Sequence, residues 1–564
     1  MFCCKINISK IIWSHKLILP KNRCKLNAYS DFSLIGGVFL QPLFFYLLLL
    51  KTNRTFLFII IIVFLIQIFN SCQYYSLEDD RVYSEIKIIK VSDNYCLGKY
   101  KGRKVYVVCN EKLEVGEIIK ANGNFIKDID IENGIVGSID IEGKILNRTY
   151  TINTKLFRFR DNIYNKLQDN LGERKAALVC SLSYGYTDYL DEVDKDNFSD
   201  MGIIHAISVS GMHVAIIYSV LKNIIKKPII IPILIIYVLF TSAPVSAVRA
   251  LIMIIIKICG EIFYRNYSSF VAIAISALIT LIYGPYLIFN LGFQLSYLST
   301  LGIILFNKQI SNTLYMIPNK IRDNVSISIS AMVFTIPILI REFNEISAIS
   351  ILGNVVIVPI LNIIIVLGNC LIVIYKNQFL FDLLSYVLMK IIVILDNVMD
   401  LLYDIGQNTI LLNKGYVFLY GTIIITIYFI RIGYKKAEIL PIIASILVIL
   451  NIYSPFLKIE YLEQGGVVLS YRGENVILLQ DSCSDIQKLK RIYATDEVII
   501  DKNTNIAIAG VVLTQDETAY VLKTNNNTIY LDVSRYKNKD YNAINFKRDY
   551  IDVLYVIDNK IYSY

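Results

Sequence analysis

The chain has 564 residues, of which 55% are hydrophobic and 18% charged, and its net charge is +9. Because soluble proteins are usually about 25% charged, this composition excludes a simple soluble domain. It predicts a polytopic membrane protein with soluble segments. The positive charge is concentrated near the N-terminus, where residues 1–72 carry eight Lys and Arg against one acidic residue. Neither soluble segment is therefore basic enough to be a general nucleic-acid-binding domain.

Residues 1–72 are predicted to form a basic N-terminus followed by a membrane anchor. The first 32 residues lack the apolar core of a secretory signal. Two apolar runs follow, at 33–50 and 55–71. Since two full crossings would leave the basic N-terminus outside, we expect only 55–71 to cross and 33–50 to lie in or re-enter the membrane.

Residues 73–158 alternate strand-like pieces with Gly and Asn turns, which predicts a β-barrel of about five strands. Within it, residues 95–109 are typical of a hairpin whose turn centres on Gly102-Arg103. That turn places Cys96 and Cys109 opposite each other, so we expect a disulfide between them. The other eight cysteines are scattered, and no CxxC motif indicates a zinc or thiol-redox site.

The tip of this hairpin mixes basic and aromatic side chains, a combination suited to phosphate contact and base stacking. The alternative is an ordinary solvated hairpin tip with cross-strand tyrosines. The candidate nucleic-acid-binding residues are Lys99, Tyr100, Lys101, Arg103 and Lys104.

The pattern predicts an amphipathic juxtamembrane segment over residues 159–201 and a polytopic membrane domain over residues 202–455. Basic loops near residues 225, 315 and 434 alternate with loops that carry little positive charge. The positive-inside rule then makes the basic side cytoplasmic and puts residues 73–201 and 456–564 outside. The expected spans are 202–221, 228–243, 245–264, 268–285, 289–306, 324–341, 346–375, 379–402, 415–430 and 438–454.

The first of these spans holds two of the three histidines of the chain. In hydrocarbon an imidazole or hydroxyl without a partner costs about 4–8 kcal/mol in the least forgiving reference state, so the cluster must face a polar interior. It could hydrogen-bond between helices, line a transport path, or form a metal or catalytic site, although no carboxylate lies nearby in the segment. We expect the helix to break at Ser210-Gly211. The cluster comprises His205, Ser208, Ser210 and His213.

Further polar residues interrupt the later spans. Arg249 is a permanent charge in an apolar run, costing at least about 2.5–3.5 kcal/mol near a bilayer centre unless it is paired or hydrated. It could instead snorkel to the outer surface, since Pro244 lies only five residues before it. Gln294, in a polar run with Ser296 and Thr300, and Asn354 each suit interhelical hydrogen bonding. Together these residues indicate a hydrated interior. The candidate site residues in these later spans are Arg249, Gln294 and Asn354.

These segments resemble the ComEC family of competence proteins, the inner-membrane DNA channel of natural transformation. The resemblance rests on motifs that follow one another in the order of the family. It implies that residues 73–158 form an OB-like domain, and that the chain conducts DNA rather than catalysing a reaction. The motifs are Gly185 through Phe198 and Gly202, then His205-Ala-Ile-Ser-Val-Ser-Gly-Met-His213, then Pro244 with Val248-Arg249-Ala250, then Gly292 to Tyr297, then Asn354 to Pro359.

The chain departs from the pattern of the family in three places. Tyr186 follows Gly185 where the family often has an aspartate, and Ser208 stands where a small apolar residue is usual. Many members also end in a metallo-β-lactamase-like domain, but residues 456–564 contain no histidine. We therefore expect a degenerate or truncated β-rich C-terminal domain without metal or nuclease activity.

The predicted fold is thus a polytopic α-helical membrane protein with an external OB-like domain and a short β-rich C-terminal domain. The resemblance implies uptake of single-stranded DNA across the plasma membrane of a bacterium, with no cofactor or metal. Its expected partners are an external DNA receptor and a cytoplasmic helicase, and self-association is left open. Two alternatives remain: an intramembrane hydrolase or transferase using His205, Ser210 and His213, and a decayed relative that transports nothing.

Overall fold

The described part of the chain forms two compact units in the computed structural model. The first comprises residues 66–335 and 347–405, and the second residues 336–346 and 409–563. Residues 33–50, most of 55–71, and Ser208 lie outside the described residues. Within 66–563 the gaps are 78–80, 83–84, 92–95, 110, 112, 121, 132, 142–146, 151, 208, 344, 348, 406–408, 412–414, 463–465, 480–485, 494, 496, 501–504, 509–510, 517–518, 524–527, 533–542, 546–550, 552 and 558–559.

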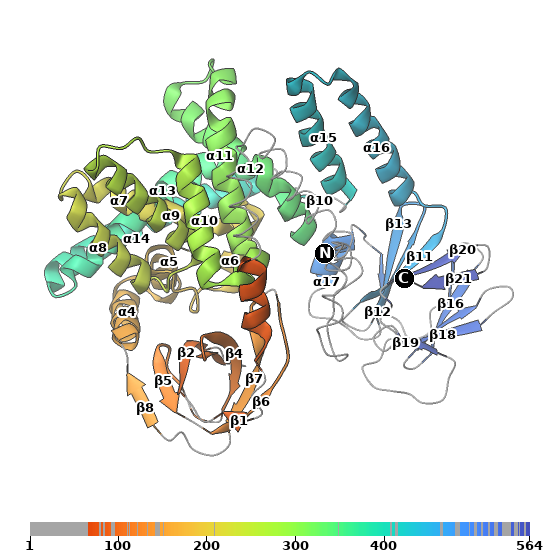
Figure 1. The fold of residues 1–564 in the computed structure, drawn as a ribbon, viewed down its shortest axis with the longest axis horizontal. Coiled ribbons are helices and arrows are strands. Elements are labelled where there is room, and N and C mark those ends of the chain that lie inside the picture. Colours follow the sequence, from red (N-terminus) through yellow and green to blue (C-terminus); the bar gives the residue numbers. More distant parts are fainter. Residues whose placement is uncertain are drawn as a thin grey trace, which may run out of the picture. The chain divides into compact units, whose positions relative to one another are not determined.

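The first unit begins with a helix over residues 66–75 and a curled eight-stranded sheet, shown in orange in Figure 1. The sequence predicted about five strands, because four-residue strands are too short to show a clear alternation. The strand order is β1-β6-β7-β4-β3-β2-β5-β8, and the β4–β7 pair is parallel. The strands are β1 (Arg81–Val82), β2 (Glu85–Val91), β3 (Cys96–Tyr100), β4 (Arg103–Val108), β5 (Glu117–Lys120), β6 (Gly123–Ile126), β7 (Ile135–Ile141) and β8 (Asn147–Tyr150).

The β3–β4 hairpin turns one residue earlier than predicted. Tyr100 pairs with Arg103, so the turn residues are Lys101 and Gly102, both with positive φ. This register places Cys96 opposite Val107 instead of Cys109, and both thiols are free. The predicted disulfide is therefore wrong, since a one-residue error in the turn changes every cross-strand partner.

The helices between residues 152 and 405 follow most of the predicted spans, with ends that differ by a few residues. The predicted span 202–221 is the exception, because it divides into a short 3-10 turn and a separate helix. The helices are α4 (Ile152–Leu171), α5 (Glu173–Tyr184), α6 (Glu192–Asp200), η1 (Ile204–Ala206), α7 (Gly211–Leu221), α8 (Lys227–Phe240), α9 (Val245–Ile262), α10 (Ser269–Tyr283), η2 (Pro285–Phe289), α11 (Leu291–Thr313), α12 (Asn319–Phe343), α13 (Ser350–Ile374) and α14 (Gln378–Ile405).

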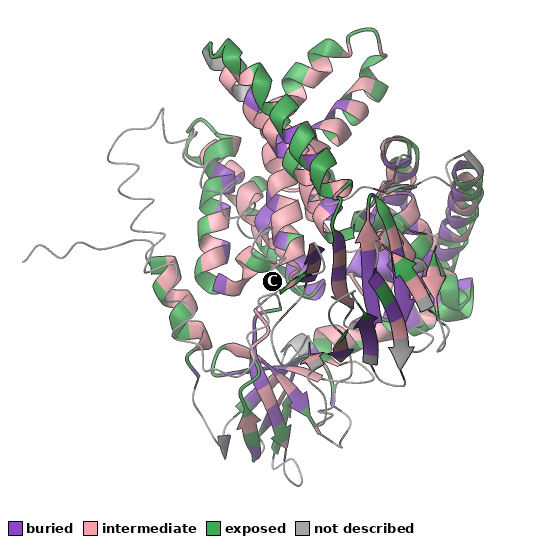
Figure 2. Cartoon of the chain, turned by 90° about the vertical axis from the view of Figure 1, so that its right-hand side faces the viewer, coloured by how far each residue is buried: buried purple, intermediate pink, exposed green. Residues whose placement is uncertain are grey.

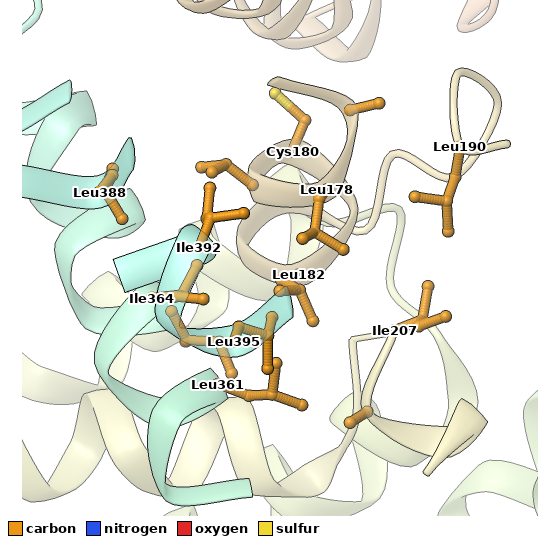
Figure 3. Close-up of a cluster of buried hydrophobic side chains, with 14 of the residues drawn as sticks. Leu178, Cys180, Leu182, Leu190, Ile207, Leu361, Ile364, Leu388, Ile392 and Leu395 are labelled. Carbon is orange, nitrogen blue, oxygen red and sulfur yellow. The ribbon is translucent and has the colours of Figure 1, made fainter. Parts of the chain in front are cut away.

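The largest hydrophobic core of this unit joins α5 to α13 and α14. Figure 3 shows Leu178 and Leu182 of α5 facing Leu361 and Ile364 of α13 and Leu395 of α14. Fully burying a side chain of this kind stabilises the fold by about 1.5–3 kcal/mol. The core thus holds together helices that are almost two hundred residues apart in the chain.

Many apolar residues on the helices stay exposed, as the green segments of Figure 2 indicate. On α8 these include Ile229, Ile236 and Leu239. Exposed apolar faces of this kind are typical of surfaces that contact lipid or a partner. Among the described residues, three helices are long and apolar enough to cross a membrane, namely Ile321–Phe343, Ser350–Ile374 and Gln378–Tyr403.

The second unit contains a helical hairpin followed by two β-sheets. The sheets, of orders β14-β13-β12-β11-β20-β21 and β15-β16-β17-β18-β19, share one core that includes Leu469, Leu522 and Leu554. In the described part of the chain no three His, Cys, Asp or Glu residues could together hold a metal ion. The elements are β9 (Glu345–Ser347), β10 (Thr409–Leu411), α15 (Gly415–Ile432), η3 (Lys435–Glu438), α16 (Ile439–Ile452), β11 (Leu457–Leu462), β12 (Gly466–Tyr471), β13 (Glu474–Leu479), α17 (Ile486–Tyr493), β14 (Val498–Ile499), β15 (Asn505–Ile508), β16 (Val511–Asp516), β17 (Ala519–Lys523), β18 (Thr528–Asp532), β19 (Ala543–Asn545), β20 (Val553–Ile557) and β21 (Lys560–Ser563).

Candidate functional site

The polar cluster lies where the first predicted span breaks. Helix α7 begins at Gly211, and Ser210 is its N-cap residue, with an extended backbone. The Ser210 side chain accepts a hydrogen bond from the Met212 N–H at 3.2 Å. Serine is a favoured N-cap because its hydroxyl satisfies one of the backbone N–H groups that lack an intrahelical partner. The predicted break at Ser210-Gly211 is therefore confirmed.

His213 completes this cap. Its side chain is fully buried, and its Nδ1 accepts the Ser210 N–H at 3.0 Å and lies 3.1 Å from Ser210 Oγ. Because Nδ1 accepts, a neutral imidazole carries its proton on Nε2. Among the described residues, Nε2 has no partner in good hydrogen-bonding geometry. The Ser210–His213 pair thus resembles a catalytic dyad in distance, but its hydrogen bonds are those of a helix cap.

Two other predicted polar residues, His205 and Asn354, lie on neighbouring elements. His205 lies on η1 with its side chain exposed. Asn354 lies on α13. At its neighbour Gly353, an added Cβ atom would lie 2.9 Å from the Met201 carbonyl oxygen. The start of α13 therefore packs on the chain just before η1, at the opposite end of the segment from Ser210.

Arg249 lies on α9 and is 91% buried, since its relative exposure is 9%. Its Nε donates to Ser296 Oγ at 2.9 Å, and its Nη1 donates to Thr300 Oγ1. The ring of Tyr297 lies 5.8 Å away. Throughout the described ranges, no carboxylate forms an ion pair with this guanidinium. Arg249 is therefore a buried cation held by hydroxyl groups, and it points at α11 instead of snorkelling away from the helices.

Gly211 brings the start of α7 against this guanidinium. A Cβ atom at position 211 would lie 2.7 Å from Arg249 Nη2, so only glycine allows so close an approach. The N-terminus of a helix carries roughly +0.5 elementary charge. Two sources of positive potential therefore meet at one point, an arrangement that favours a bound anion.

Helix α11 is positioned by its own polar residues. Gln294 Nε2 donates to the Ile288 carbonyl at 2.9 Å, which joins η2 to the start of the helix. Tyr297 OH lies 3.0 Å from Thr280 Oγ1 on α10. Gln294 therefore orders the backbone at the start of the helix, whereas the described hydrogen bonds of Arg249 go to other residues. The sequence identified Ser296 and Thr300 as polar but could not pair them with Arg249.

A row of three lysines crosses the outer face of the β-sheet. Lys99 on β3 pairs with Lys87 on β2 and with Lys104 on β4. Like charges directly opposite each other destabilise a sheet, so this row favours an anionic ligand. Burial, and then the charge of Lys99, lower the pKa of Lys104. Lys87 was missed by the sequence analysis, although its outward phase in the Glu85–Val91 strand could have revealed it.

The other hairpin candidates divide between surface and core. Tyr100 is only 2% exposed and packs in the core of the sheet, so its assignment as a base-stacking residue is wrong. Arg103 Nη2 donates to the Gln73 carbonyl at 2.6 Å, and Lys101 lies against the Tyr100 ring. Alternation explains the error, because residue 100 has the inward phase of β3 while Tyr106 has the outward phase of β4.

Comparisons with known proteins cover the region that contains Arg249. Residues 182–436 match the family described as Competence protein. The chain is 27% identical to the ComE operon protein 3 of Bacillus subtilis (strain 168) over 214 residues, which are 36% of this chain and 27% of that relative. It is 24% identical to an uncharacterized protein of Aquifex aeolicus (strain VF5) over 169 residues, 29% of this chain and 39% of that relative.

The chain therefore aligns with less than half the length of each of these relatives. No solved structure matches it. The motifs that carry the resemblance, including those around His213 and Arg249, nevertheless fall inside the matched region. Residues 182–436 of the chain therefore carry a Competence protein domain, in the same region as the motifs that resemble the ComEC family.

Proposed function

We propose that this protein conducts single-stranded DNA across the plasma membrane of a bacterium during natural transformation. The match to the competence family supports a role in DNA uptake. The strand itself is the substrate, and the protein acts without a cofactor or a catalytic residue. An external DNA receptor and a cytoplasmic helicase would deliver and pull the strand, and a homo-oligomer would be compatible with this role.

The observation that carries this proposal is the buried guanidinium beside the start of α7. Arg249 is bonded only to neutral groups in the described contacts, and Gly211 lets the N-terminus of α7 approach it. Its hydroxyl partners stabilise the guanidinium without neutralising it. A passing phosphate would find a fixed bidentate donor there. A buried charge retained without a counter-ion in an apolar helix is most economically explained by a transient anionic ligand.

The eight-stranded sheet of residues 81–150, called the β-domain below, supports the same function on the side expected to lie outside the cell. Strands β2, β3 and β4 form a meander, and β4 pairs in parallel with β7. This order is compatible with the Greek-key barrel of OB folds, in which the second and third strands bind nucleic acid. Lys99 lies on β3 and Lys104 on β4, which are the second and third strands of this meander. A row of lysines near the half-exposed Tyr106 can bind phosphates and stack a base without reading sequence.

The alternative enzyme would use Ser210 and His213. Their 3.1 Å contact favours it, but His205 lies exposed on η1 and supplies no described third member. Deleting the gene in a transformable host separates these functions. A channel predicts that DNA still binds the cell surface but does not become protected inside, whereas a hydrolase predicts a changed lipid or cell-wall composition with normal uptake. A decayed relative predicts no change in either.

The membrane topology gives a separate prediction. Reporter fusions at residues 120 and 500 should be active outside the cell, and those at 225, 315 and 434 should be active inside. The basic loops at the three latter positions are the physical reason, because Lys and Arg are retained on the cytoplasmic side. A cytoplasmic signal from residue 500 would contradict the topology of every span beyond residue 202.

A further inference from the structure

Tyr286, in the short η2 turn between α10 and α11, packs against the β-domain. Its ring lies 5.2 Å from the ring of Tyr74, measured between centroids, and Lys104 Nζ lies 4.5 Å from its centroid. Lys104 Nζ also donates to the Asn133 carbonyl at 3.1 Å. Lys104, the last lysine of the row, is therefore in contact with the membrane domain.

Hydrogen bonds hold this contact in place. Tyr74 OH accepts the Lys104 N–H at 3.0 Å and donates to the Gly134 carbonyl at 2.8 Å. Gly134 has a φ of +71°, and a Cβ atom there would lie 2.2 Å from a carbon of the Tyr286 ring. The ring thus fills a space that exists only because residue 134 has no side chain. The helix over 66–75 adds a second contact, since Gln67 Nε2 donates to the Leu281 carbonyl at 2.9 Å.

The same turn leads directly to the Arg249 site. Gln294 ties Ile288 of η2 to the first turn of α11. Ser296 and Thr300, which hold the guanidinium, lie on the next turn and a half of that helix. A displacement of η2 would therefore be transmitted to the hydroxyls that hold Arg249.

We propose that Tyr286 is a positioning residue that docks the β-domain onto the start of α11, so that a DNA strand bound along the lysine row enters at the Arg249 site. This inference rests on the proposed function and adds a specific contact between its two parts. The strand is recognised by its phosphates at both places, and the docking contact keeps the two sets of donors in a fixed relation.

The Gly134→Ala variant tests this docking while leaving every lysine of the row intact. The methyl group must displace the Tyr286 ring, and misplacing a positioning group by about 1 Å can cost roughly 100-fold in rate. We therefore expect DNA entry to fall by roughly 10- to 100-fold, with surface binding of DNA unchanged. Hydrogen exchange of the backbone at residues 286–290 should become faster in the purified full-length protein.

Gly172→Ala is the matched control. Gly172 also has a positive φ (81°), with an extended ψ (164°) that is almost restricted to glycine, so alanine is strained there too, but its Cβ would meet nothing within 4 Å. Equal loss of entry in both variants would overturn the proposal, because strain alone would then explain it. Tyr286→Ala is a second variant that removes the ring without strain, and it should reproduce the Gly134→Ala defect.

Failure of this inference is distinguishable from failure of the proposed function. Normal entry in Gly134→Ala and Tyr286→Ala, together with a defect in an Arg249 variant, would overturn the docking role alone. Normal entry in the Arg249 variant as well would overturn the channel.

Discussion

Replacing Arg249 by glutamine should reduce DNA entry by roughly 10- to 150-fold while leaving surface binding of DNA intact. A hydrogen bond to a charged group contributes about 1.5–3 kcal/mol, and each 1.4 kcal/mol corresponds to about a factor of ten. Glutamine keeps one donor for Ser296 or Thr300 but loses the charge that a phosphate would meet. Internalised DNA can be measured as radiolabel that becomes resistant to added nuclease.

Three measurements make this result specific. Arg249→Lys should restore part of the entry, because lysine keeps the charge but not the bidentate geometry. Arg265→Gln changes the net charge equally at an exposed position just beyond α9, and cells with this variant should take up DNA normally. Immunoblots of membranes should show equal protein levels for all three variants. Normal entry in a well-expressed Arg249→Gln variant would mean that the guanidinium has only a structural role.

Replacing Lys87 and Lys99 together by alanine should weaken binding of single-stranded DNA and make it less sensitive to salt. Each lost phosphate contact should reduce the slope of log K against log salt by about 0.7, so the double variant should lose about 1.4. Binding should fall equally for different sequences, because phosphate contacts carry no sequence information. Titrations of purified protein in detergent at several salt concentrations provide the measurement.

Lys155→Ala serves as a control for this experiment. Lys155 is exposed on α4, outside the sheet, and its removal changes the net charge by the same amount per substitution. Its slope should match that of the unmodified protein. If the double variant also kept the original slope, the lysine row would be an ordinary solvated face. Removing the like-charge row should also stabilise the sheet slightly, by a few tenths of a kcal/mol.

Hydrophobic pattern alone was enough to locate most of the helices. The apolar run that predicted a span at 346–375 became α13 (Ser350–Ile374), and the one at 379–402 became α14 (Gln378–Ile405). The break at Ser210 was likewise predictable, since serine followed by glycine favours a helix N-terminus over its interior. These features are local, because propensity and capping act within a few residues along the chain.

Residue type also identified the polar groups that the apolar helices must accommodate. Arg249 and His213 stand out in any reading of the sequence, because each is costly in hydrocarbon without a partner. Their partners could not be predicted. Ser296 lies 47 residues from Arg249, and the contact exists only because α9 and α11 pack together.

Only the tertiary structure decided which polar residues meet and which face water. A one-residue change in the hairpin turn put Val107 opposite Cys96 in place of Cys109, and the inward phase of β3 put Tyr100 into the core. The contact of Tyr286 with Gly134 joins residues 152 positions apart, and nothing in either local sequence indicates it. Such contacts depend on how whole elements pack, whereas helix formation and helix ends depend mainly on neighbouring residues. The sequence therefore determined the class of the protein and its unusual residues, and packing determined the geometry of the candidate site.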